Sequence, residues 1–167
     1  MITIELKDAE VSRMLARLAA SMSDLTPVMQ EIGEQLVFET GQRFNQGVSP
    51  EGAAWAPKAE TTLEAYSRRG DKVDFRPLFG PSGRLHSTID YRAGADFVEV
   101  GSGAIYAAVM QFGAAKGAFG ADSAGHPIPW GTIPARPFIG LSEIDRGNII
   151  ATVNEWIERL AAGGDGA

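Results

Sequence analysis

The chain has 167 residues, a length that suits one domain with its own hydrophobic core. Apolar residues make up 44% and charged residues 22%, which argues against a disordered chain. No apolar run approaches the roughly 20 residues that cross a bilayer, so no membrane anchor is expected. The net charge of -6 disfavours nonspecific binding to nucleic acid, and the absence of cysteine excludes disulfides, thiolate nucleophiles and cysteine metal sites.

The first twenty residues predict a strand followed by a helix. Apolar and polar residues alternate from Ile2 to Lys7, the pattern of a strand with one buried face. No basic stretch followed by an apolar run precedes them, so we expect no secretion signal and synthesis in the cytoplasm. Helical spacing follows, which predicts a helix over residues 9–20, at Val11, Met14, Leu15 and Leu18.

A longer second helix is predicted from Thr26 to about residue 46. Thr26 suits the N-cap position and Pro27 the first helical position, because proline lacks the N–H that this turn leaves unpaired. Gly47 is expected to end the helix. Gly33 and Gly41 are expected to weaken it, each by up to about 1 kcal/mol relative to alanine.

Two long loops are predicted, over residues 48–81 and 113–133. The first is rich in proline, glycine and charge without a regular period. The second carries five glycines and many alanines, so it offers little side-chain area to bury and should be mobile in an isolated subunit. Loops of this length are usually functional.

A β-hairpin is predicted between the loops, with strands over residues 85–93 and 97–100 joined at Gly94-Ala95-Asp96. Residues 106–112 suit a short helix or strand. After the second loop, Pro134 and Pro137 require an extended path, and a strand is expected over residues 138–141.

A C-terminal helix is predicted to begin after Ser142, which with Asp145 approximates a capping box, and to end at Gly163. Residues 163–167 are expected to be a frayed tail. The order of these elements predicts an α+β fold in one domain over residues 1–167, with a small antiparallel sheet packed on one face by helices and two long loops.

No motif of an active site, metal centre or cofactor site is found. His86 and His126 do not have the i, i+4 spacing of a helical zinc site, and no serine lies in a Gly-x-Ser-x-Gly turn. The Gly101-Ser102-Gly103 turn has Tyr106 where a dinucleotide loop needs a third glycine. A small hydrolase that uses His86 with Asp90 and Glu99 stays open, and requires these groups to converge in one pocket.

Aromatic residues are unusually frequent in and beside the two loops, and either core packing or partner contacts would account for them. Trp55, Phe119 and Trp130 are therefore interface candidates, although Trp55, Tyr106 and Phe112 suit core anchors better. Phe119 and Trp130 are expected to become ordered on assembly. Arg136 should pair through its planar donor fork with a carboxylate or carbonyl, within the chain or across subunits.

Four blocks of residues carry a family resemblance. The first is Phe44, Ser49-Pro50-Glu51-Gly52 and Trp55-Ala56-Pro57, and the second is Ser82-Gly83-Arg84-Leu85 with Ser87 and Ile89. The third is Val100-Gly101-Ser102, Tyr106-Ala107 and Gln111-Phe112-Gly113, and the fourth runs from Ile133 through Pro134, Arg136, Pro137, Phe138 and Gly140 to Ser142. In this order they resemble the phage virion-morphogenesis, or Mu-like tail-completion, family.

The resemblance implies a structural virion protein that completes or terminates the head-proximal end of a phage tail and joins it to the neck. It implies no catalysis and no cofactor. The implied partners are further copies in a homo-oligomeric ring, a hexamer by expectation, with the tail tube and the neck or connector proteins. DNA would pass through the ring without sequence-specific binding. A head-to-tail connector and a free-standing nucleic-acid-binding module remain alternatives.

The sequence departs from the family pattern at two places. Met110 stands where the family often has histidine before Gln111, and a charged insert runs from Glu60 to Arg76. The resemblance assigns no role to either.

Overall fold

The computed structural model describes residues 16, 19–20 and 22–162. The predicted strand at residues 2–6, most of the helix at residues 9–20 and the tail at residues 163–167 lie outside this part. The described elements are α2 Thr26–Gln46, α3 Glu60–Arg68, α4 Arg84–Ser87, β1 Ile89–Ala93, β2 Val98–Ser102, α5 Ala107–Phe112 and α6 Glu143–Ala161. Helices with one small antiparallel sheet confirm the predicted α+β class. None of these helices has the length and apolarity needed to cross a membrane.

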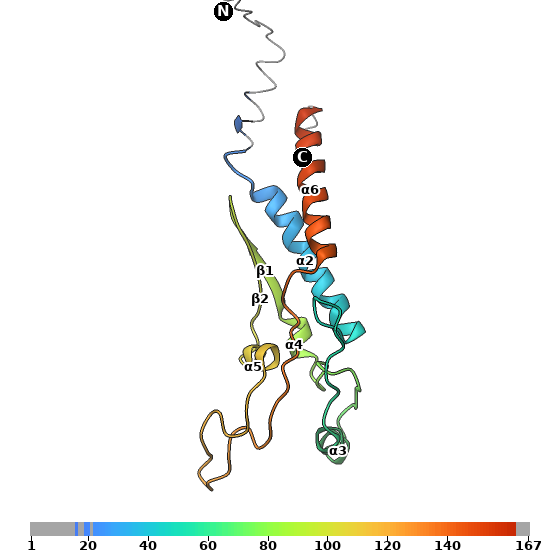
Figure 1. Ribbon diagram of the computed structural model, residues 1–167, viewed down its shortest axis with the longest axis vertical. Coiled ribbons are helices and arrows are strands. Elements are labelled where there is room, and N and C mark those ends of the chain that lie inside the picture. The colour runs from blue at the N-terminus through green and yellow to red at the C-terminus, as the bar shows by residue number, and fades with distance from the viewer. Residues whose placement is uncertain (1–15, 17–18, 21, 163–167) are drawn as a thin grey trace, which may run out of the picture.

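α2 is the middle layer of an elongated body. The β1–β2 hairpin packs on one side of it and α6 on the other (Figure 1). In the hairpin, Tyr91 pairs with Val100 and Arg92 with Glu99. Alternate residues face α2 and are half-buried, whereas Asp90, Arg92 and Glu99 face solvent. The predicted hairpin is therefore present, with its helices on one face.

The start of α2 differs from the prediction. Leu25, not Thr26, occupies the N-cap position, and the carboxylate of Asp24 accepts a hydrogen bond from the Thr26 N–H at 2.9 Å. The Leu25 N–H donates to the carbonyl of Ala95 at 3.0 Å, which ties the start of the helix to the hairpin turn. Gly47 ends α2 in the left-handed conformation, as predicted.

Gly33 permits the close approach of the hairpin to α2. A Cβ atom at this position would lie 2.1 Å from Cδ2 of Tyr91, a separation that non-bonded atoms cannot adopt. The Tyr91 ring therefore packs directly on the helix backbone. The glycine that weakens the isolated helix is thus required by the packing of the sheet.

α6 begins with the predicted capping box. Ser142 Oγ accepts from the Asp145 N–H, and the Asp145 carboxylate accepts from the Ser142 N–H. Asp145 also forms a buried ion pair with Arg43 of α2. Further along α6, Trp156 completes an apolar cluster on the helices, formed with Val28, Ile32 and Leu36.

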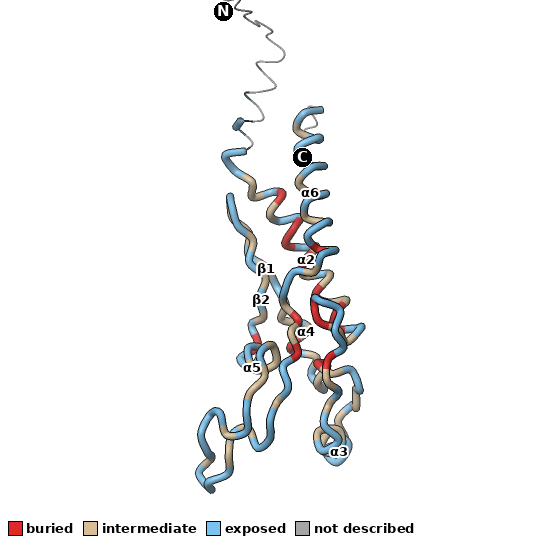
Figure 2. The backbone as a smooth tube through the Cα atoms, viewed as in Figure 1, coloured by how far each residue is buried: buried red, intermediate tan, exposed pale blue. Residues whose placement is uncertain are grey.

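A second apolar cluster lies at the lower end of α2. It contains Phe44, Trp55, Leu78, Leu85, Ala104 and Phe138, and the red segments of Figure 2 gather here and along α2. Phe44 and Phe138 have no exposed surface and their rings meet edge to face at 5.2 Å between centroids. Truncation of either ring to alanine would cost about 3–5 kcal/mol.

Three local predictions were wrong. The first loop contains the helix α3, which buries none of its residues. Leu85 begins no strand, because Arg84–Ser87 form one helical turn ahead of β1. Residues 138–141 form no strand with the described part of the chain, and Ile139 and Gly140 lie in a bend. For residues 106–112, where helix and strand were both open, the structure has the helix α5.

Candidate functional site

The four blocks of the family pattern meet along one extended segment, residues 133–140, which we call the strap. Trp55 Nε1 donates to the carbonyl of Pro137 at 2.8 Å. The ring of Pro50 lies against Gly140, where a Cβ atom would come within 2.8 Å of Pro50 Cγ. The blocks are separated in sequence but form one junction between the helical body and the lower half of the molecule.

The side chain of Gln111 bonds the backbone of the strap as a neighbouring strand would. Its Nε2 donates to the carbonyl of Ile139 at 2.9 Å, and its Oε1 accepts from the N–H groups of Phe138 at 2.9 Å and Ile139 at 3.1 Å. A side-chain amide thus satisfies the backbone groups that a strand would pair. Gly113 follows at φ 75°, and a Cβ there would lie 2.7 Å from the Ile133 carbonyl.

Arg136 braces the strap from inside. It is buried, and its Nε and Nη2 donate to the carbonyls of Ala56 and Pro57, each at 2.8 Å. Burial lowers the pKa of its guanidinium from the usual value. The predicted pairing with a carbonyl is therefore found within the chain, and the same is true of Trp55, whose indole is buried in the core. The structure therefore corrects the prediction that Trp55 and Arg136 are interface residues, because neither side chain faces outward.

Two arms leave the junction at the end of the molecule away from the described start and end of the chain (Figure 1). The helical arm, residues 57–82, contains α3. Lys58 Nζ links the start of this arm to its returning segment by donating hydrogen bonds to three backbone carbonyls, those of Asp74, Arg76 and Phe79. Desolvation lowers the pKa of Lys58. Hydrogen bonds from the Arg76 guanidinium lower the pKa of Asp74 to about 2.

The loop arm, residues 114–132, is an irregular hairpin. Ala114 and Ile133 exchange backbone hydrogen bonds at its base, at 2.9 and 2.8 Å. Phe119 N–H donates to the Ile128 carbonyl further along. At the tip, the N–H and ring of His126 bond the Asp122 carboxylate, and the backbone bond is the main cause of the lowered pKa of Asp122. The predicted loop has an ordered backbone path despite its glycines.

A cleft of about 620 Å³ lies between the roots of the two arms. Its lining is mainly apolar and includes Pro57, Leu78, Tyr106, Met110, Pro129 and Ile133. None of the described residues that line it is a carboxylate or a histidine. This chemistry suits an apolar or proline-rich protein segment better than a small polar substrate.

Large apolar side chains are exposed on the arms and on two flanks of the body. The arms carry Phe75, Phe119 and Trp130, with 75%, 57% and 72% of their surface exposed. The α5 patch consists of Ile105 and Phe112, 98% and 77% exposed, and the α6 patch of Leu141 and Ile144, 44% and 72% exposed. Phe112 and Tyr106, expected as core anchors, are exposed, because only one side of the short helix α5 packs on the core.

The remaining predicted motif residues are structural. Gly52 at φ 81° closes a turn by donating to the carbonyl of Ser49, and Gly83 at φ 62° precedes α4. Leu85 belongs to the core, Gly101 lies on the outer face of β2, and Pro134 borders the cleft. The sequence did not indicate Ile105, Ile144 or Lys58, since Ile105 and Ile144 fall off the helical stripes and a lone lysine has no motif.

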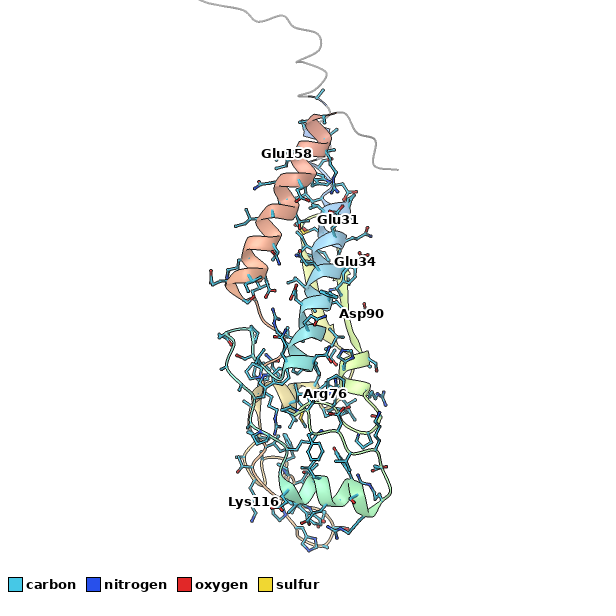
Figure 3. All side chains as sticks on the ribbon, turned by 90° about the vertical axis from the view of Figure 1, so that its right-hand side faces the viewer. Glu31, Glu34, Arg76, Asp90, Lys116 and Glu158 are labelled. Atoms are coloured by element: carbon cyan, nitrogen blue, oxygen red, sulfur yellow. The ribbon has the colours of Figure 1, made fainter. Side chains whose placement is uncertain are left out.

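Charge is divided unevenly between body and arms. The body, residues 22–47, 88–103 and 141–162, has eleven acidic and four basic residues, whereas the two arms, residues 57–82 and 114–132, together have five acidic and six basic ones. Figure 3 shows Glu31, Glu34, Asp90 and Glu158 on the body and Lys116 on the loop arm. The arms therefore present a different electrostatic surface from the helices.

The residues of the possible hydrolase do not converge. His86 packs against Phe44, edge to face, and against Phe79, at 5.4 and 5.1 Å between ring centroids. Asp90 and Glu99 lie on the solvent face of the hairpin, where Glu99 pairs with Arg92. Within residues 22–162, no three His, Asp or Glu side chains are placed to hold a metal ion.

Comparison with known proteins gives a consistent result. The model of the phage virion morphogenesis family matches residues 6–158. The chain is 28% identical over 161 residues to Mu-like prophage FluMu G protein 2 of Haemophilus influenzae, across 96% of this chain and 99% of that protein. No solved structure matches the chain.

Proposed function

Because the chain belongs to the phage virion morphogenesis family, we propose that it is a non-enzymatic structural subunit that completes or terminates the head-proximal end of a phage tail and joins it to the neck. A role in phage morphogenesis follows from the family. The position at the tail end, the ring and the lack of catalysis are the proposal. The protein would lie in the tail or neck of the virion, after assembly in the host cytoplasm.

The observation that carries the ring is the presence of two unlike apolar patches. A closed ring of identical subunits needs a heterologous interface, in which one surface of each copy meets a different surface of the next. The α5 patch and the α6 patch belong to elements on different sides of α2 (Figure 1). Exposed isoleucines and phenylalanine at these positions contribute nothing to the isolated fold. We propose a ring of six copies built on this pair.

The arms supply contacts to other proteins. Each is held at its root, by Lys58 or by the strap, and carries exposed aromatic side chains, Phe75 on the helical arm and Phe119 and Trp130 on the loop arm. Rigidly presented aromatic groups are typical anchors of protein interfaces. We assign the arms to the tail tube on one side and the neck or connector on the other.

The acidic body suits the wall of a DNA channel. Negative charge repels the phosphate backbone, so a duplex crosses the ring without sequence-specific binding or adhesion. A filter-binding assay should find no salt-dependent affinity for duplex DNA. Tight binding that weakens steeply with salt would contradict this part of the proposal.

Imaging tests the ring and its place. The purified protein, or the assembled particle, should show closed rings, with the mass of six chains by light scattering. Particles that lack the protein should carry overlong or unstable tails. Finished tails of normal length without heads would instead identify a head-to-tail connector, and a persistent monomer in solution and in particles would overturn the ring.

A further inference from the structure

The hairpin has one open edge. A two-stranded sheet is marginal in water, and unpaired strand edges are templates for a further strand. Among residues 22–162, the backbone groups of Val98–Ser102 hydrogen-bond only to β1. The Tyr91 N–H points away from β2, so the bonded pairs are Asp90–Gly101 and Arg92–Glu99. The backbone groups of Val98, Val100 and Ser102 therefore face outward along the edge.

The edge of β1 is less available than that of β2. The Tyr91 N–H, which would pair with a strand on that side, already donates to the carboxylate of Asp90 at 2.8 Å. A third strand is therefore expected beside β2.

The open edge borders an apolar cluster that the described residues cover only in part. Val98 and Val100 of β2 are half-buried and pack on the cluster that contains Trp156 of α6. Three residues of α6 on the same cluster are also half-buried, namely Ile149, Val153 and Leu160. A strand added beside β2 would extend the inner face of the hairpin toward α6 and remove these side chains from water.

Residues 2–6 have the alternation that this edge requires. In β2, Val98 and Val100 face inward while Glu99 faces solvent. In the segment Ile2 to Lys7, the apolar residues Ile2, Ile4 and Leu6 alternate with polar ones in the same way. Strand addition demands this match, because a shift by one residue turns every apolar side chain outward.

The described residues ahead of α2 indicate which copy provides the strand. Ala16, Ala19, Ala20 and Met22 are all exposed, although Leu25 is fixed at the hairpin turn. These four described residues therefore do not pack on the hairpin of their own copy. We propose that residues 2–6 of one copy add as a third strand to the β2 edge of the next copy. This inference rests on the ring proposed above.

Engineered cysteines test this proposal, because the natural chain has none. One chain carries Glu99→Cys, and a second chain with a tag of different mass carries Thr3→Cys, Glu5→Cys or Lys7→Cys. All four positions are on the solvent face, where non-bonded strand pairs place Cα atoms about 4.5 Å apart, within disulfide range. Oxidation of the mixed ring should give a covalent dimer of one chain of each kind. Ile4→Cys, on the inner face, is the matched control and should cross-link far less.

A further chain carries both Glu99→Cys and Glu5→Cys. A disulfide within this doubly substituted chain but none between the two singly substituted chains would overturn the donated strand, and so would the absence of a cross-link from any of the three positions in a formed ring. As a second measurement, Ile4→Lys should reduce ring formation by on the order of tenfold or more, because it places a charge on the apolar face. Glu5→Lys, on the opposite face, should not. The circular dichroism spectra of the two monomeric variants should match that of the natural protein, which verifies that both variants fold.

The outcomes separate this inference from the proposed function. If Ile4→Lys forms rings normally and no cross-link appears, the donated strand is refuted. The proposal of a ring is not affected by this result. A wild-type protein that forms no ring in solution or in particles contradicts the proposed function itself.

Discussion

Arg43 of α2 and Asp145 of α6 form a buried ion pair at the point where the strap joins α6. The two side chains are 8% and 1% exposed. Arg43 Nη1 also donates to the Gly140 carbonyl at 3.0 Å, and the Asp145 carboxylate accepts from the Ser142 N–H at 2.6 Å. Helix packing, helix capping and the strap thus share one polar centre.

Asp145→Asn should lower the free energy of unfolding by about 3–5 kcal/mol, because it leaves the Arg43 charge buried without a counter-charge. Urea unfolding measures this. The control is Arg92→Ala, which breaks an exposed pair with Glu99 and should cost less than about 1 kcal/mol. Equal losses in the two variants would show that burial does not govern the first pair.

Gly33→Ala and Gly147→Ala should have effects of opposite sign, although both glycines lie inside helices. Alanine at position 147 meets no atom within 4 Å and should stabilise the protein by about 1 kcal/mol through helix propensity. Alanine at position 33 collides with Tyr91 and should destabilise it by about 1–3 kcal/mol. Thermal unfolding distinguishes them, and a stabilising Gly33→Ala would refute the close packing of the hairpin.

Arg136→Met should loosen the helical arm at its root. It removes two charge-assisted hydrogen bonds and leaves the carbonyls of Ala56 and Pro57 unpaired, at a cost of about 2 kcal/mol or more. Limited proteolysis should cut the helical arm faster than in the natural protein. Arg136→Lys should recover only part of the loss, since an ammonium cannot reproduce the two-donor fork. Full recovery by lysine would contradict the bidentate role.

The helical arm should lose order in acid before the body does. The Asp74 carboxyl has a pKa of about 2 in the folded chain against a usual 3.8, so its contribution is complete above the usual value and is lost as pH falls toward 2. Amide hydrogen exchange should show greater loss of protection for Glu60–Arg68 than for α2 between pH 5 and pH 2.5. Asp74→Asn should remove this difference by weakening the arm at both pH values.

Phe112→Ser and Ile144→Ser should abolish ring formation without affecting the fold. Both side chains are exposed in the subunit, so each change should alter the free energy of unfolding by no more than about 0.5 kcal/mol. Light scattering measures assembly. Phe38→Ser is the matched control, since Phe38 is also largely exposed, at 62%, but lies outside the two patches. Rings formed by either patch variant would exclude that patch from the interface.

The periodic parts of this fold could be predicted from sequence. Val28, Ile32 and Leu36 repeat at i, i+4 and i+8, a spacing that indicates the helix α2, and the Ser142–Asp145 capping box indicates the start of α6. Both signals are local in sequence. The helix α3 could not be predicted in this way, since none of its residues is buried. Its position depends on Lys58, whose three acceptors are carbonyls 16 to 21 residues away.

The junction could be recognised from sequence as a pattern but not explained. Residues 138–141 have the apolar character of a strand, yet their backbone partner is the side chain of Gln111. Trp55 and Phe112 are both aromatic and both near loops, but one is buried and the other exposed. Composition alone cannot tell which of the two aromatic residues is buried. Segments distant in sequence determine which side of a short helix such as α5 packs against the core.

The strap has a mechanical consequence. It contacts α2 through Gly140, the root of the helical arm through Arg136, and the root of the loop arm through Ile133. Tension on the loop arm would therefore pass along these eight residues into α6 and, through Gly140, into α2. A ring built from such subunits would share the load of a moving tail around its whole circumference.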